Sequence, residues 1–170
     1  LLAEARLAFR CGLGSQPRFD RADLDLGLSE PTLQSRIRAV AFDDGTADFD
    51  RAKALEVMES ILQKHPDLDA VFCGNDAMAM GAYQALVGAG KVDQVKVFGF
   101  DGADDVVQLI AEKKIAATGM QFPKLMARTA AEFADQYIRG KRDFEQKIPV
   151  KVDLVTPDNV HKYGDYGRKD

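Results

Sequence analysis

The sequence predicts an α/β fold built on an open parallel sheet with helices on both faces. Three short apolar runs are typical of buried strands, at residues 69–74, 95–100 and 115–120. Helical patterns follow the first two runs, so each is expected to form a strand–helix unit of a parallel sheet. Hydrophobic residues make up 46% of the 170 residues, which is enough for a packed core.

The first half of the predicted sheet begins with a short strand at residues 37–42. A helix then starts with Asp50 as its N-cap and ends at Pro66. Its apolar residues recur at helical spacing, at Ala54, Leu55, Met58, Ile61 and Leu62. After the strand at 69–74, Asp76 is the expected cap of a second helix, which Gly88 and Gly90 close.

The second half adds two further helices and a last strand. One helix starts at Asp104 or Asp105 after the strand at 95–100, and another spans residues 123–138, where Pro123 opens it and Gly140 ends it. Residues 148–155 are expected to form the final strand. The polar tail at 156–170 is expected to be loosely held.

Charge and composition exclude several classes of protein. The net charge is −4, which gives no electrostatic reason to bind nucleic acid. Cys11 and Cys73 form no disulfide framework, and Cys73 is expected to be a buried thiol. No Cys/His cluster has metal-ligand spacing, so neither a metal nor a cofactor is expected. No run approaches the roughly 18 apolar residues of a membrane span, so no direct membrane insertion is expected.

The candidate site consists of three polar residues that follow the three apolar runs. They are Asn75, Asp101 and Gln121. Ligands of open parallel sheets bind at the carboxyl ends of the strands, so these side chains are expected to face one crevice. Two amides and a carboxylate can both donate hydrogen bonds to hydroxyl groups and accept them. The pattern indicates a polyhydroxylated small molecule such as a sugar.

Two other interpretations of Asp101 remain open on the residues alone. It can be a turn aspartate beside Gly102, or the phosphoacceptor of a receiver-like domain in which Asp43-Asp44 would hold magnesium. The second needs a basic partner after a later strand, and the nearest is Lys124. Nothing in the sequence supports an enzyme, because it contains neither a nucleophile elbow nor a Ser/His/Asp trio.

Five segments in order carry a resemblance to a known family. They are Ala47-Asp48-Phe49-Asp50-Arg51, Ala70-Val71-Phe72 with Gly74-Asn75-Asp76, Val97-Phe98-Gly99-Phe100-Asp101-Gly102, Ile115-Ala116-Ala117-Thr118 with Gln121 and Pro123, and Ile148-Pro149-Val150. With them, residues 47–160 resemble the periplasmic sugar-binding proteins of ABC transporters, of the ribose-binding type, which have the type I periplasmic binding protein fold.

This resemblance implies a function and a set of ligand contacts. Two lobes would close on a monosaccharide and present it to a membrane permease in the periplasm. Asn75, Asp101 and Gln121 match positions that hydrogen-bond the sugar, and Phe49 and Phe100 match aromatic residues near the sugar ring. The alternative function is that of the effector domain of a sugar-responsive repressor, which shares the fold and the Gly-Asn-Asp and Gly-Phe-Asp motifs. The segments after residue 115 favour the transport branch.

The resemblance also predicts the domain organisation. Residues 1–39 match nothing recognisable, residues 40–121 would form the sugar-binding lobe, and residues 122–170 would hold a helix–strand unit of the partner lobe, a hinge crossing and the polar tail. We therefore expect an incomplete protein, mainly its carboxy-terminal lobe, that by itself binds sugar weakly or not at all. The segment at 122–147 would then pack on residues 1–39 or project from the body.

Overall fold

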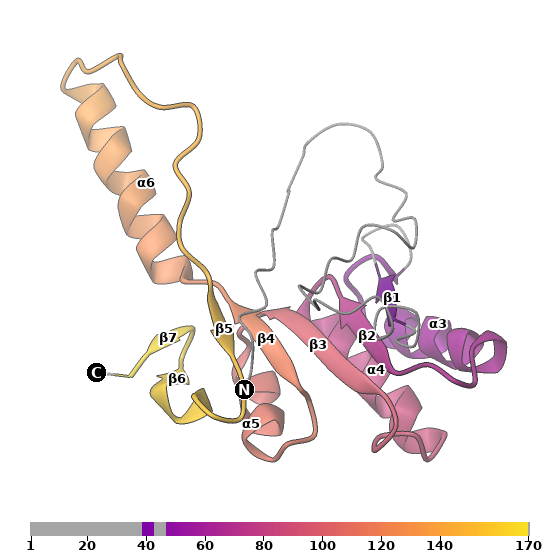
Figure 1. Ribbon diagram of the computed structural model, residues 1–170. Helices are drawn as coiled ribbons and strands as arrows, with labels where there is room; N and C mark the ends of the chain where they lie inside the picture. The colour runs from indigo at the N-terminus through magenta and orange to yellow at the C-terminus, as the bar shows by residue number, and fades with distance from the viewer. Residues whose placement is uncertain (1–38, 43–46, 170) are drawn as a thin grey trace, which may run out of the picture.

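The computed structural model describes residues 39–42 and 47–169, and within them one five-stranded sheet organises the chain. Its strands run in sequence order: β1 (Ala39–Phe42), β2 (Ala70–Cys73), β3 (Lys96–Asp101), β4 (Ala117–Met120) and β5 (Asp153–Val155) (Figure 1). The first four strands are parallel, and β5 pairs antiparallel with β4. The α/β prediction is confirmed.

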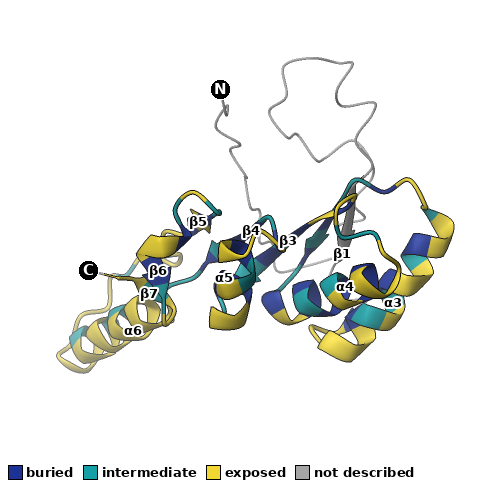
Figure 2. Ribbon diagram, turned by 90° about the horizontal axis from the view of Figure 1, so that it is seen from below, coloured by how far each residue is buried: buried dark blue, intermediate teal, exposed yellow. Residues whose placement is uncertain are grey.

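Three helices connect the parallel strands and lie on one side of the sheet (Figure 2). They are α3 (Arg51–Lys64), α4 (Asp76–Gly88) and α5 (Asp104–Ala111). As predicted, Asp50 caps α3, and its side chain accepts a hydrogen bond from the Lys53 amide. In the described part of the chain these helices cover one sheet face, whereas the sequence predicted helices on both faces. Phe72 and Phe98, paired in register on the other face, are half-buried.

The core fills the space between the sheet and the helices. Val71 and Val97 are register partners on the helix side, and both are buried. Methionines from two helices, Met58 of α3 and Met78 of α4, complete the packing with no exposed surface. Burying such side chains provides most of the stability of a domain of this size.

The last strand is shorter than the sequence predicted. Residues 148–155 were expected to be extended, but only Asp153–Val155 forms a strand. Asp153 pairs with Met120, the last residue of β4. Among the described residues, those before Asp153 therefore have no neighbouring strand, because the chain leaves the sheet after Met120.

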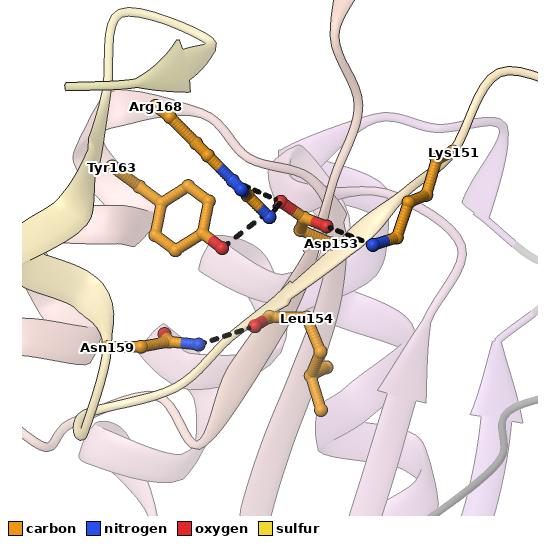
Figure 3. Close-up of polar contacts among 6 residues, drawn as sticks. All are labelled: Lys151, Asp153, Leu154, Asn159, Tyr163 and Arg168. Atoms are coloured by element: carbon orange, nitrogen blue, oxygen red, sulfur yellow. Dashed lines mark hydrogen bonds and ion pairs between the residues drawn. The ribbon is translucent and has the colours of Figure 1, made fainter. Parts of the chain in front are cut away.

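Residues 156–169 of the tail are ordered, so the prediction of a loose tail is wrong. It forms the 3-10 turn η1 (Val160–Lys162) and a hairpin of β6 (Tyr163–Gly164) and β7 (Gly167–Arg168). Figure 3 shows the anchor: the Oδ2 of the buried Asp153 accepts hydrogen bonds from the Tyr163 hydroxyl at 3.2 Å and from Arg168 Nε at 2.8 Å. These partners lie 10 and 15 positions from Asp153, beyond the spacing of a helix turn or a strand repeat, so a local pattern did not predict them.

The anchor can be tested at Tyr163, which is only 5% exposed. Tyr163→Ala is expected to lower the free energy of unfolding by about 3 kcal/mol, because a large buried ring is removed. Tyr163→Phe keeps the ring and loses one hydrogen bond, so about 1 kcal/mol is expected. Urea denaturation measures both. Equal, negligible losses would mean that the hairpin does not stabilise the sheet.

Helix α6 (Pro123–Ile138) projects from the sheet, which is one of the two arrangements that the sequence analysis allowed (Figure 1). None of its residues is buried, and apolar side chains such as Leu125, Met126 and Tyr137 are exposed. Its partner is the returning segment, whose Phe144 ring packs edge-on against Phe133 at 5.5 Å between centroids. The described chain therefore gives this amphipathic helix only a partial cover.

Candidate functional site

The predicted polar residues lie at the carboxyl edge of the parallel strands. Asp101 is the last residue of β3, and Gln121 directly follows β4. The side-chain Nε2 of Gln121 donates a hydrogen bond to Asp101 Oδ1 at 2.6 Å. The backbone amide of Gln121 donates a second one to the Asp101 carbonyl oxygen at 3.0 Å. Parallel pairing of β3 with β4 brings the two residues together, although 20 positions separate them.

Asn75 lies beside this pair and also caps α4. Its Oδ1 accepts a hydrogen bond from the Met78 amide at 2.8 Å. The expectation that Asp76 caps this helix is therefore wrong. The backbone amide of Asp76, the residue next to Asn75, lies close enough to the Asp101 carboxylate to lower its pKa. The described residues thus bring Asn75, Asp101 and Gln121 to one rim.

The backbone and the carboxyl group of Asp101 are both in unusual states. Its φ of 129° is rare for a residue with a side chain, and such strained positions cluster at functional sites. Partial burial raises the pKa of the carboxyl group, while the bonds from Gln121 and from the Asp76 amide oppose that shift. The result is a half-buried carboxylate held in a defined orientation at the edge of the sheet.

The two predicted aromatic residues occupy different surroundings. Phe49 is 49% exposed and has a φ of 56°, and its carbonyl accepts a hydrogen bond from Asn75 Nδ2 at 3.3 Å. The structure therefore joins Phe49 to the rim through Asn75. Phe100 lies on β3, and its ring packs directly over Gly119 of β4. A Cβ atom added to Gly119 would lie 2.6 Å from the Cδ2 atom of that ring.

Asp76 is a residue of the site region that sequence reasoning assigned incorrectly. It is 2% exposed, and its carboxylate accepts three hydrogen bonds. The donors are the Thr118 hydroxyl at 2.7 Å, the Gly102 amide at 2.9 Å and the Ala103 amide at 2.7 Å. Burial raises the pKa of this carboxyl group, and the three hydrogen bonds oppose the shift. The possible signal was an aspartate beside small residues, but its partners lie on β4 and in the loop that follows β3.

The phosphoacceptor interpretation gains no support from the described residues. Asp43-Asp44 lies outside them, and Lys124 forms an ion pair with Asp165 of the hairpin. Across residues 47–169, no group of three His, Cys, Asp or Glu side chains is arranged to hold a metal ion. Cys73 is buried, as predicted, and burial raises the pKa of its thiol to about 12, so it is not a reactive nucleophile.

Comparison with known proteins decides the family. Residues 27–142 match the family described as periplasmic binding protein domain. The chain belongs to this family. The resemblance seen in the sequence motifs is confirmed, and the periplasmic binding protein domain is a binding module, not an enzyme.

Individual relatives of this periplasmic binding protein domain are named as import binding proteins. The chain is 47% identical to the ribose import binding protein of Bacillus subtilis, over 65% of this chain and 35% of that protein. It is 42% identical to the D-apiose import binding protein of Paraburkholderia graminis, over 69% of this chain and 38% of the relative. The chain thus spans little more than a third of the length of these curated relatives.

Solved structures resemble the chain over a similar span. An ABC transporter solute-binding protein from Bacillus halodurans with bound myo-inositol is 36% identical, with a TM-score of 0.64 over 71% of this chain and 42% of that one. A protein from Actinobacillus succinogenes with bound D-allose is 30% identical, with a TM-score of 0.65 over 69% and 41%. None of the helices the structure describes is both long and apolar enough to cross a membrane.

Proposed function

We propose that this chain forms the monosaccharide-binding lobe of a solute-binding protein that serves an ABC import system in the periplasm. The observation that carries the proposal is the rim of Asn75, Asp101 and Gln121, fixed by the 2.6 Å bond between the last two. The relatives are named for ribose and D-apiose, and the similar structures hold D-allose and myo-inositol. All four are small polyhydroxylated molecules, which matches the chemistry of the rim.

The rim offers both acceptors and donors to sugar hydroxyls. The Asp101 carboxylate is a charged acceptor, and hydrogen bonds to charged groups are roughly twice as strong as neutral ones. Gln121 donates to Asp101 through Nε2 and so keeps its Oε1 as an acceptor. Asn75 gives one amide hydrogen to the Phe49 carbonyl and keeps the other for a ligand oxygen. Adjacent hydroxyls of one sugar can satisfy all three.

The aromatic residues supply the apolar part of the proposed site. A sugar ring presents C–H groups on its faces, and an exposed aromatic ring can cover them. Phe49, half-exposed beside Asn75, suits this role. Phe100 precedes Asp101 on β3 and is proposed as the second aromatic neighbour. Neither residue requires a metal or a cofactor.

The partners follow from the same assignment. A membrane permease would receive the sugar, and the family match to import proteins favours this role over that of a repressor effector domain. The proposed boundaries are those predicted from the sequence, with residues 40–121 as the sugar-binding lobe and residues 122–170 as the unit that crosses to the partner lobe. The net charge of −4 gives no reason to add a nucleic-acid partner.

Titration with monosaccharides, followed by NMR, tests the proposal. Pentoses and hexoses are expected to shift the backbone resonances of residues 75, 101 and 121 with millimolar affinity, because the described rim touches a ligand from one side only. Asp101→Asn is expected to weaken binding at least about tenfold, or about 1.4 kcal/mol. Asp93→Asn is the matched control, because Asp93 lies in the turn before β3, at the amino ends of the strands. This variant should leave the affinity unchanged.

Two outcomes would contradict this picture. If no monosaccharide shifts the three rim resonances, the proposed function fails. Micromolar or tighter binding would refute the claim that the rim contacts the sugar from one side only. It would not contradict the sugar-binding function itself.

A further inference from the structure

The carboxylate of Asp76 lies beneath the proposed rim and joins the three segments that carry it. Asp76 belongs to the segment of Asn75, since it follows that residue. Its Oδ2 accepts from Gly102 and Ala103, which follow Asp101, at 2.9 and 2.7 Å. Its Oδ1 accepts from Thr118, three residues before Gln121, at 2.7 Å. One buried side chain therefore links the segment of Asn75 to the segments of Asp101 and Gln121.

The link between Asp76 and the β3–α5 loop runs in both directions. The side chain of Asp76 accepts the backbone amides of Gly102 and Ala103. The backbone amide of Asp76 in turn lies near the Asp101 carboxylate and lowers the pKa of that group. This arrangement satisfies the two loop amides with one carboxylate, as a capping side chain does at a helix start. It also fixes the position of Asp101 relative to Asn75.

Asp101 needs such a restraint. Its φ of 129° is unfavourable for an aspartate, and the surroundings have to hold it there. Bonds to the next two amides restrain the chain directly after the strained residue. An apolar side chain could fill the same volume, but it would leave two amides and the Thr118 hydroxyl without this acceptor, at a cost for each.

We propose that Asp76 is a positioning residue for ligand binding, which sets the spacing of Asn75, Asp101 and Gln121 without touching the ligand itself. The binding part of this inference rests on the proposed function. The geometric part does not, because it concerns hydrogen bonds within the chain itself. This separation allows the two ideas to be tested apart.

The first measurement uses the ligand-free protein. In Asp76→Ala, the amide proton signals of Gly102 and Ala103 are expected to move upfield as their charged acceptor is lost, and the Gln121 side-chain amide is expected to lose its protection from exchange. Asp76→Asn keeps an oxygen for the two amides and can donate to Thr118, so it should restore both signals. Unchanged Gly102, Ala103 and Gln121 signals in Asp76→Ala would overturn the proposal.

The second measurement separates positioning from stability. Met58→Ala is the control for stability, because it removes a buried core side chain of α3 and is expected to lower the melting temperature. None of the contacts described above joins Met58 to the rim. At a temperature where all variants are folded, Asp76→Ala is expected to weaken monosaccharide binding at least about tenfold. Met58→Ala should stay within about twofold of the parent chain, and Asp76→Asn within about threefold.

The remaining outcomes are also decisive. Equal affinities of Asp76→Ala and Met58→Ala would overturn the positioning role. If Asp76→Ala does not fold, Thr118→Val replaces it, and an affinity unchanged in that variant would count against the proposal. If the parent chain binds no monosaccharide, the proposed function fails, and the Gln121 exchange measurement alone decides whether Asp76 positions the rim.

Discussion

Gly81→Ala is expected to be among the most destabilising single substitutions in the described chain. Gly81 lies in α4 at the contact with α3, where an added Cβ would overlap the Arg51 carbonyl oxygen. The same Cβ would lie 2.9 Å from the Ala54 Cβ and 3.0 Å from the Leu55 nitrogen. Two of these three atoms belong to backbone, so no side-chain rotation relieves the overlap. The helices would have to separate.

The expected loss in the free energy of unfolding is more than about 3 kcal/mol, the upper part of the range for overpacked cores. Gly88→Ala is the matched control, because it makes the same change at the end of the same helix with no atom within 4 Å of the new Cβ. Alanine favours helix over glycine, so this variant should gain up to about 1 kcal/mol. Urea denaturation compares the two. A Gly81→Ala chain within about 1 kcal/mol of the parent would show that the helix contact is not close-packed.

Local patterns predicted the elements that position the rim. The apolar runs and capping residues placed each parallel strand within a few residues of its observed bounds, and parallel strands necessarily end at one edge. The strand ends alone therefore predict that Asn75, Asp101 and Gln121 lie together. It could not supply the 2.6 Å bond between Asp101 and Gln121, because side-chain contacts between strands depend on the register.

What the sequence analysis missed depended on contacts distant in sequence. Asp76 was predicted as a helix cap because the local pattern suits one, yet its hydrogen-bond partners lie 26, 27 and 42 positions away. The tail was predicted to be loose because it is polar. Its stability comes from Tyr163, buried beside Asp153, ten residues earlier. Polar side chains that pair across elements leave no periodic signal in the sequence.

Gly99→Ala is expected to disrupt both the fold and the rim, through Asp76. Gly99 lies on β3 opposite the start of α4, and a Cβ there would overlap Asp76 Oδ1 and lie 3.2 Å from the Ala79 Cβ. Glycine is needed for space alone. The substitution should push the carboxylate away from Gly102, Ala103 and Thr118, and so lower the free energy of unfolding by about 3 kcal/mol.

A double-mutant cycle with Asp76→Ala tests this cause. If Gly99→Ala acts by displacing the Asp76 carboxylate, it should lower the free energy of unfolding much less in a chain that already carries Asp76→Ala. The expected coupling energy is about 1–3 kcal/mol. The control cycle pairs Gly99→Ala with Met58→Ala, whose effects should add to within about 0.5 kcal/mol. Additive losses of Gly99→Ala and Asp76→Ala would mean that the glycine is required by the close approach of Ala79. Strand β3 and helix α4 would then be held apart by packing, and the buried carboxylate would have no part in their spacing.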